Sequence, residues 1–321
     1  MPPLLKLILM RFGLGALTLF LVSVVVFAAT QALPGDTARA ILGKDATPQR
    51  LELLRQQLGL DKPVPQQYWE WLSGVAQGDL GDSLVQQGMS VTSLLRDRVK
   101  NSAALVLIAA LVSVPFSIII GALSAVWRDS KFDMTASVGN LTLAALPEFV
   151  IGIGLVLVFA TNVFKVLPAV SRLDPSVSMF RQLHLLILPA LTLTLAVAPY
   201  ISRILRASMI EVLESEYVMM ARLKGLSNHL VLWRHALPNA IVPTLQVIAL
   251  NLAWLAGGVV VVEYLFGFPG IGQALVDAVA NRDLPMIQAL CLLIAGVYVV
   301  LNLMADLGTI LVSPRLRTGL R

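Results

Sequence analysis

The residues that could do chemistry are few, and their spacing forms no catalytic set. Three histidines are present, and they make no plausible metal-ligand set: His184, His229 and His235. Gly43-Lys44 is followed by Asp45 where a phosphate-binding P-loop needs Ser or Thr, so this pair gives no means of holding ATP. The single cysteine, Cys291, lies in an apolar stretch and leaves no intramolecular disulfide or cysteine-based metal site. The sequence therefore predicts no enzyme, cofactor or metal site in this chain.

Two carboxylates, Glu148 and Asp306, lie inside long apolar stretches. Glu148 is about 12 residues into its stretch, or roughly 18 Å at 1.5 Å per residue, near the middle of a bilayer. Carboxylates at that depth are costly and usually face a bundle interior or a wet cavity. Glu148 could line a pathway and contact a peptide's amino terminus or a cationic substrate, or it could be a structural residue beside a kink at Pro147. For Asp306 we expect packing or a salt bridge.

Composition shows what must position these residues. Of the 321 residues, 57% are hydrophobic and 13% are charged, whereas soluble domains have about 45–50% and about 25%. With a mean hydropathy of +0.81, the chain lacks the polar surface that a water-soluble globule needs. This excludes a cytosolic enzyme, a disordered region and a nucleic-acid module. The net charge of +5 comes from Lys and Arg that flank apolar runs instead of forming a patch.

Six apolar stretches are long enough to cross a membrane as helices, since a span needs about 20 such residues. The first is too long for a signal-peptide core and is interpreted as a retained anchor. An even number of spans places both termini on one side. The stretches are 12–35, 101–127, 134–164, 182–202, 236–262 and 284–314.

Lys and Arg in short loops mark the cytoplasmic side of a membrane protein. The long segment 36–100 is left out because such segments cross largely regardless of charge. The remaining basic residues are then concentrated in the segments that lie inside when the N-terminus is inside. This pattern predicts that both termini are cytoplasmic and that 36–100 is extracytoplasmic.

The extracytoplasmic segment 36–100 is expected to form a small lid on the bundle. Thr47 can cap a helix over 48–58, and an aromatic cluster suited to the membrane interface follows: Tyr68, Trp69 and Trp71. On the same side, the glycines of 266–272 could suggest a phosphate loop, but their spacing is wrong for one. A turn before a short surface or re-entrant helix over 272–280 is predicted there.

The inner loop 203–238 carries helix signals throughout. Acidic residues precede basic ones in an order that matches the helix dipole, with Gly225 suited to end a helix over 212–224. Ser227 can cap a second short helix that stops before Pro238. The first helix has an apolar face that could lie in a groove on a partner or simply on lipid: Tyr217, Met220 and Ala221. The acidic and basic residues are Glu211, Glu214, Glu216, Arg222 and Lys224.

This loop resembles the EAA loop of bacterial ABC importer permeases. The strings YVMMARLKGLS at 217–227 and RHALPNAIVP at 234–243 match the variant typical of the dipeptide and oligopeptide family. The common EAA pattern has Glu, Ala and Ile where this chain has Met219, Met220 and His235. Further matches to the B-type subunit (the DppB/OppB sort) run in order along the chain: LPGD at 33–36, QLGLDKPVPQQYWEWL at 57–72, GDLG at 78–81, VVVEYLFGFPGIGQALVDAV at 260–279, NRDLPMIQA at 281–289 and SPRLR at 313–317.

The resemblance implies an all-α integral membrane protein with six transmembrane helices, the type I ABC importer (MetI-like) permease fold. It also implies four kinds of partner: the lipid bilayer of the bacterial inner membrane, a second homologous permease of the C type, two ABC ATPases that hold ATP and Mg, and an extracytoplasmic substrate-binding protein. The implied organisation is an anchor over 1–35, the segment 36–100, a permease core over 101–314 with the coupling loop 203–238, and a cytoplasmic tail over 315–321.

By the same resemblance, residues 212–224 would be the coupling helix that sits in a groove of one ATPase. Gly225 would give the sharp exit that fixes its angle. The coupling residues implied are Glu216, Tyr217, Met220, Ala221, Arg222, Lys224, Gly225, Leu237 and Pro238. The binding protein would dock on the outer stretch 266–280, together with 165–181 and parts of 36–100.

Substrate and class are left with alternatives. Relatives with this signature move dipeptides, oligopeptides, glutathione, nickel or metal chelates, and opine-like or sugar conjugates. An ion-coupled secondary transporter should show repeated halves or a relay of intramembrane ionisable residues, and the sequence shows neither. An intramembrane enzyme would need a paired catalytic set within the spans, which is also not evident.

Overall fold

Long apolar helices dominate the fold. In the part of the chain that the computed structural model describes, the regular elements are helices and no strand is present. Five of these helices are long and apolar enough to cross a membrane, and a bent pair, α6 with α7 and its extension η2, makes a sixth when it is counted as one span. This confirms the predicted all-α membrane fold. The described residues are 3–32, 47–49, 51–52, 61–86 and 88–312.

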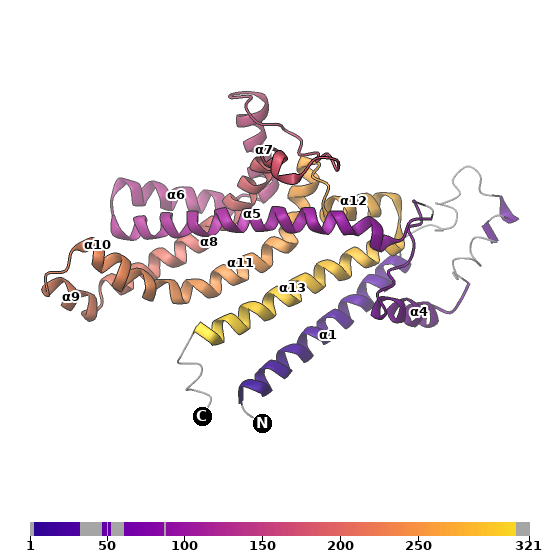
Figure 1. Ribbon diagram of the computed structural model, residues 1–321, viewed down its shortest axis with the longest axis horizontal. Coiled ribbons are helices and arrows are strands. Elements are labelled where there is room, and N and C mark those ends of the chain that lie inside the picture. Colours follow the sequence, from indigo (N-terminus) through magenta and orange to yellow (C-terminus); the bar gives the residue numbers. More distant parts are fainter. Residues whose placement is uncertain (1–2, 33–46, 50, 53–60, 87, 313–321) are drawn as a thin grey trace.

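The helix bounds, labelled as in Figure 1, are as follows. The spanning elements are α1 (Pro3–Gln31), α5 (Val91–Val126), α6 (Lys131–Ala145), α7 (Glu148–Val156) with η2 (Leu157–Thr161), α8 (Leu183–Leu213), α11 (Leu237–Phe266) and α13 (Leu284–Val312). The shorter elements are α4 (Val64–Ala76), η3 (Met179–Gln182), α9 (Glu216–Leu223), α10 (Asn228–Leu230), η4 (Val231–Ala236) and α12 (Ile271–Asn281).

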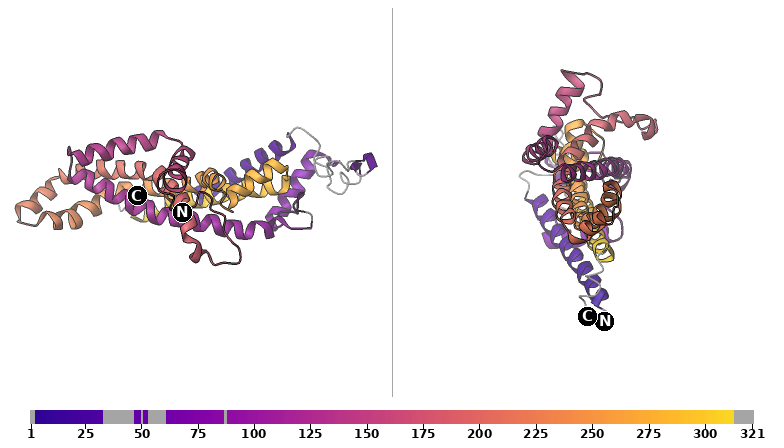
Figure 2. Two further views of the ribbon diagram at one scale, coloured as in Figure 1. Left: turned by 90° about the horizontal axis from the view of Figure 1, so that it is seen from above. Right: turned by 90° about the vertical axis from the view of Figure 1, so that its left-hand side faces the viewer.

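The core lies where α5, α8 and α11 run side by side, with α6 beside α5 (Figure 1). Leu105 of α5, Leu193 of α8 and Leu255 of α11 belong to one fully buried cluster. The backbones of α5 and α8 approach closely at Gly121, where an added Cβ would lie only 2.7 Å from the Ser202 carbonyl oxygen. Small residues at crossings let membrane helices pack tightly. Figures 1 and 2 place α9 at one end of the long axis and α4 toward the other.

Helices α1 and α13 form an antiparallel pair beside this core. At one end Gln288 donates from Nε2 to the Thr30 hydroxyl at 2.8 Å. At the other, Arg11 Nη1 lies 2.8 Å from Asp306 Oδ2. The salt bridge predicted as one role for Asp306 is thus present, and it ties the first and last spans together.

The third predicted span, 134–164, is not one helix with a kink. Its two halves meet at an angle of 110° across Leu146 and Pro147. Proline disfavours helical geometry in the residue before it, and Leu146 is extended with φ −92° and ψ 134°. After the break, α7 packs on α11, where a Cβ at Gly152 would lie 2.5 Å from Leu265 Cδ2. Glu148 therefore begins a new helix at the bend.

Part of the predicted lid is visible in α4, which packs on α1. The Tyr68 hydroxyl lies 2.8 Å from the Ser23 hydroxyl, and the Phe27 ring lies 5.4 Å from Tyr68 and 5.6 Å from Trp71 between centroids. The predicted aromatic cluster thus contacts a span. The predicted helix 48–58 falls mostly outside the described residues.

Candidate functional site: the inner loop and a mid-span cavity

The inner loop forms a short helix whose ends are both sharply defined. Helix α8 runs on to Leu213, and α9 starts at Glu216 after Ser215, which is extended at the N-cap position. At the other end Gly225 has φ +78°. Its amide donates to the Arg222 carbonyl at 2.9 Å, and the Leu226 amide donates to the Ala221 carbonyl at 3.4 Å. These two bonds form a Schellman motif, which needs a left-handed residue at Gly225.

The predicted helix 212–224 was therefore too long. Glu211 lies in the last turn of α8 and Glu214 in the turn that follows, so neither belongs to the first turn of the short helix. Charged residues such as Glu211 do not end α8, because a helix with polar side chains on its surface can continue into water beyond the bilayer. Of the predicted acidic set, Glu216 alone begins α9, while Arg222 lies in its last turn and Lys224 at its C-cap.

One face of α9 packs on its own chain and the other is open. Val218 and Ala221 are buried against Val231, with Leu226 completing the cluster. Ala221 was predicted to face a partner together with Tyr217 and Met220, and this is wrong for Ala221, which is only 6% exposed. The open face consists of Tyr217, Met219, Met220 and Leu223, with exposures of 46, 57, 53 and 74%. We call these four residues the α9 face.

The second helix of the loop does not stop before Pro238. Helices α10, η4 and α11 form one continuous helix from Asn228 to Phe266. Ser227 caps its start, as predicted, by accepting from the Leu230 amide. Pro238 falls in the first turn of α11, just after the π-helical turn Val231–Ala236, and Leu237 packs against a buried cluster that includes Leu205 and Met209 of α8. A wide turn next to the proline allows the helix to continue.

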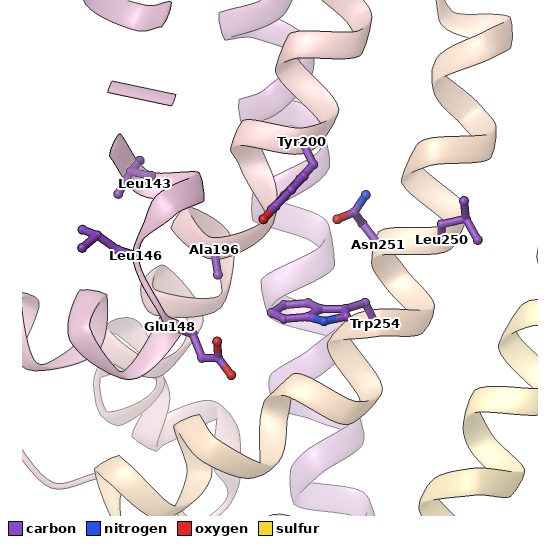
Figure 3. A pocket seen from close by; sticks show the side chains of 8 residues that line it. All are labelled: Leu143, Leu146, Glu148, Ala196, Tyr200, Leu250, Asn251 and Trp254. Atoms are coloured by element: carbon purple, nitrogen blue, oxygen red, sulfur yellow. The ribbon is translucent and has the colours of Figure 1, made fainter. Parts of the chain in front are cut away.

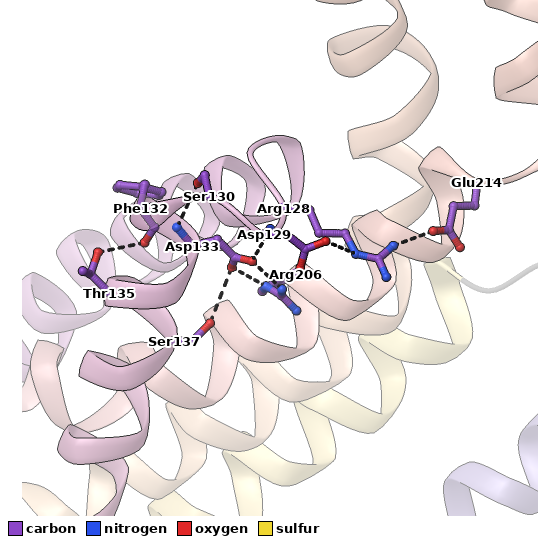
Figure 4. Close-up of polar contacts among 9 residues, drawn as sticks. All are labelled: Arg128, Asp129, Ser130, Phe132, Asp133, Thr135, Ser137, Arg206 and Glu214. Carbon is purple, nitrogen blue, oxygen red and sulfur yellow. Dashed lines mark hydrogen bonds and ion pairs between the residues drawn. The ribbon is translucent and has the colours of Figure 1, made fainter.

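Ion pairs fix α5 and α6 to α8 beside the start of α9 (Figure 4). Arg206 of α8 donates from Nε and Nη2 to the two carboxylate oxygens of Asp133, at 2.6 Å each. Asp133 is buried in the first turn of α6. Arg128, just past α5, donates to Glu214 Oε1 at 2.6 Å. A bidentate Arg–carboxylate pair holds a fixed geometry. The end of α8, from which α9 follows, is therefore fixed relative to α5 and α6.

Glu148 opens into a cavity of about 350 Å³ between α6, α7, α8 and α11 (Figure 3). The cavity lies beside the middle of α8 and of α11. Polar and aromatic side chains from distant parts of the sequence join the carboxylate there. The lining residues are Leu143, Leu146, Glu148, Ala196, Tyr200, Leu250, Asn251 and Trp254.

Comparison with known proteins identifies the class of this molecule. Residues 113–318 match the family described as "Binding-protein-dependent transport system inner membrane component", and residues 4–88 match its N-terminal companion, "Binding-prot-dependent transport system membrane comp, N-term". The chain belongs to this family of importer permeases. It is the transmembrane component of an ABC importer and not an enzyme, since ATP is hydrolysed by partner subunits.

Individual relatives match along almost the whole permease. The glutathione transport system permease protein GsiC of Pectobacterium atrosepticum is 38% identical over 303 residues, covering 94% of this chain and 95% of the relative. GsiC of Escherichia coli K12 matches equally, at 38% over 303 residues with the same coverage. The probable peptide ABC transporter permease y4tP of Sinorhizobium fredii is 38% identical over 298 residues, covering 92% and 94%. The permease is accordingly a multi-pass inner-membrane protein whose class works with ATPases, a second permease and a binding protein.

A further polar site in the permease was missed from the sequence. Glu263, in the last turn of α11, is fully buried. Its Oε1 accepts from the Ser102 hydroxyl at 2.5 Å and its Oε2 from the Gly272 amide at 2.7 Å, while the Ile271 amide donates to Ser102 Oγ at 2.8 Å. A carboxylate from α11 therefore caps the positive end of α12.

The glycines of this turn are explained by that carboxylate. A Cβ at Gly270 would lie 2.2 Å from Glu263 Oε1, and one at Gly272 would lie 2.3 Å from the Val260 Cα. Gly267 takes the left-handed conformation with φ +60° that ends α11. The predicted turn and short helix are present, with α12 over Ile271–Asn281. The glycine-rich stretch surrounds a carboxyl group of the chain itself. The signal that could have revealed it is a Glu in a span's last turn, followed by Gly-x-Gly.

Proposed function

We propose that this permease is the B-type subunit of an importer for peptides and peptide-like solutes, glutathione included. Its partners would be a C-type permease, two ABC ATPases that hold ATP and Mg, and an extracytoplasmic binding protein. Support for this substrate class comes from the names of the relatives, which are permeases for glutathione and for peptides. The sequence matches to the dipeptide and oligopeptide variant of the EAA loop agree with it.

The observation that carries the proposal is the α9 face. Four adjacent large apolar side chains are exposed on a helix that extends beyond the spans. Exposed apolar patches of this kind mark interaction sites, and an apolar helix face suits a groove on a partner. We propose that α9 is the coupling helix, with Tyr217 and Met220 in contact with an ATPase and Glu216, Arg222 and Lys224 at the rim.

Coupling would use α9 as a rigid lever. Val218 and Ala221 tie α9 to Val231 at the base of the helix that becomes α11, and Leu237 and Pro238 continue that helix into the bilayer. Closure of the ATPases would displace α9 and tilt the spans behind it, as in other hinge and shear transitions. In this arrangement both termini and α9 are cytoplasmic, while 36–100 and α12 are extracytoplasmic.

Gly225 provides the sharpest test of the lever. No atom lies within 4 Å of a Cβ built on it, so a substitution there meets no steric clash. A β-branched residue would still resist φ +78°, at a cost of about 1–2 kcal/mol. In the reconstituted importer, we expect Gly225→Val to lose most ATP-driven uptake while the complex assembles. Gly225→Asn is the matched control, because Asn tolerates this conformation.

The partner assignment has its own test. Extraction in mild detergent with a tag on this chain should recover the two ATPases and the second permease. The chain alone in vesicles should move no dipeptide. Uptake unaffected by Gly225→Val, or transport by the single chain without an ATPase, would contradict the proposal.

A further inference from the structure

We propose that the cavity at Glu148 is a binding site for a primary ammonium group carried by the transported solute. This inference rests on the proposed function and adds to it the chemical group that the pathway recognises. Four residues from three helices carry the argument: Glu148 from α7, Tyr200 from α8, and Asn251 and Trp254 from α11.

The carboxylate supplies the charge. Glu148 lies at the helix break and is partly exposed to the cavity. Within the described part of the chain, no Lys or Arg forms an ion pair with it and no donor bonds to it. A carboxylate in the middle of a membrane is costly without a cation or water. A cationic solute passing through the cavity would supply the missing charge.

Two further oxygens are positioned to accept hydrogen bonds. Asn251 donates from Nδ2 to the Val247 carbonyl at 2.8 Å, which fixes its amide orientation and leaves Oδ1 directed into the cavity (Figure 3). The Tyr200 hydroxyl donates to the Ala144 carbonyl at 3.5 Å, a long contact that leaves its lone pairs free. An ammonium group has three donors and no acceptor. The carboxylate, the amide oxygen and the phenol oxygen are acceptors on different parts of the cavity wall, so an ammonium group could bond to one of them while the others bind its water or neighbouring donors.

The indole of Trp254 completes the site. Its ring lies between the Glu148 carboxylate and the Asn251 side chain in the view of Figure 3. It is held from behind by α11 itself, since a Cβ at Gly258 would touch the ring at 3.1 Å. Cations bind favourably over the face of Trp, and more so when partly desolvated. A carboxylate next to an aromatic face selects a positive group and disfavours an anionic one.

The test measures the charge preference of the cavity in the complete importer, purified in detergent without nucleotide. A thiol is introduced by Leu143→Cys, at the cavity wall, with Cys291→Ser removing the native one. Its labelling rates with trimethylammonium-ethyl and sulfonato-ethyl methanethiosulfonate are each divided by that reagent's rate with a free thiol in solution. Leu107→Cys, on an exposed face of α5 away from the cavity, is the control for access.

With Glu148 present, the cationic reagent should be favoured about tenfold, the lower range of enrichment seen in charged clefts. Glu148→Gln should bring the ratio close to one, Glu148→Asp should keep it, and Trp254→Leu should lower it in part. Dialanine should slow labelling and N-acetyl-dialanine should not. Equal rates for both reagents, a ratio indifferent to Glu148→Gln, or equal protection by both dipeptides would overturn the proposal. Equal rates for both reagents would be expected if a cationic side chain of the second permease were paired with Glu148.

Failure here and failure of the importer assignment are distinguishable. Dipeptide or glutathione uptake by the unmodified importer tests the assignment. Normal uptake with a labelling ratio of one removes the ammonium site and leaves the importer. A high cationic-to-anionic labelling ratio in a complex that imports neither dipeptide nor glutathione with ATP would support the ammonium site and contradict the assigned function.

Discussion

The two ends of the long helix that contains α11 are built in opposite ways; in the proposed topology the α9 end is the inner end and the α12 end is the outer end. At the inner end α9 is held by three small buried side chains, and its other face is open. At the outer end Glu263 locks α12 in place through a hydroxyl and backbone amides, with no room for a single Cβ at Gly270 or Gly272. The end proposed to bind a partner keeps exposed apolar surface, whereas the other end is held in shape by buried, hydrogen-bonded polar groups.

The largest effect on stability is expected at the outer end, from Gly272→Ala. The added Cβ would lie 2.3 Å from the Val260 Cα, a backbone atom that cannot move without displacing α11. We expect no folded permease to accumulate in the membrane, as judged by size-exclusion chromatography of a fluorescent fusion. Gly139→Ala is the matched control, since no atom lies within 4 Å of its Cβ. A normal elution profile for Gly272→Ala would remove the claim that the outer turn is locked.

An intermediate effect is expected from Arg206→Ala near the inner end. The change strips a buried carboxylate, Asp133, of its bidentate partner, which costs about 3 kcal/mol at the lower end of the range for buried pairs. The lower end applies because the Arg206 side chain is 30% exposed. SDS-induced unfolding in mixed micelles measures the loss. Arg128→Ala, which breaks the exposed pair with Glu214, should cost under about 1 kcal/mol. Equal losses would show that burial does not distinguish the two pairs.

The smallest effect on stability is expected on the α9 face. Leu223 is 74% exposed, so Leu223→Asp should change the free energy of unfolding by less than about 0.5 kcal/mol. Recovery of ATPases with the tagged permease should nevertheless fall sharply, because a charge is placed in the apolar contact. Glu211→Gln, on the neighbouring turn of α8, is a surface control that should change neither. Undiminished recovery with Leu223→Asp would assign the ATPase contact to another surface.

Much of the fold could be predicted because the apolar runs carry it. The ends of the helices could not be predicted. Helix α5 begins at Val91 and α8 ends at Leu213, both outside the apolar runs. Charged side chains there reach water, so hydrophobicity no longer indicates where the helix ends. Pro147 predicted a kink but not its 110° angle, and the close packing of Gly152 on α11 that accompanies the bend is a tertiary contact that the local sequence does not show.

The candidate site was predicted in the same uneven way. The spacing around Gly225 located the short helix, and its left-handed conformation agrees with the glycine. The face of α9 was misjudged at Ala221, because Val231, ten positions along the chain, covers it. Glu148 was located by its charge alone. Its neighbours Tyr200, Asn251 and Trp254 come from two other helices, and their convergence is a property of packing that no local spacing carries.

The uninterrupted helix from Asn228 to Phe266 has a mechanical consequence. It meets α9 at Val231, presents Asn251 and Trp254 to the cavity, and ends beside Glu263. One continuous helix thus connects the proposed ATPase contact, the proposed solute site and the turn at Glu263. A displacement of this helix at its α9 end would therefore reach the cavity and the turn at Glu263 at the same time. Release of the solute and movement of the turn would then be one concerted step instead of a sequence of separate steps.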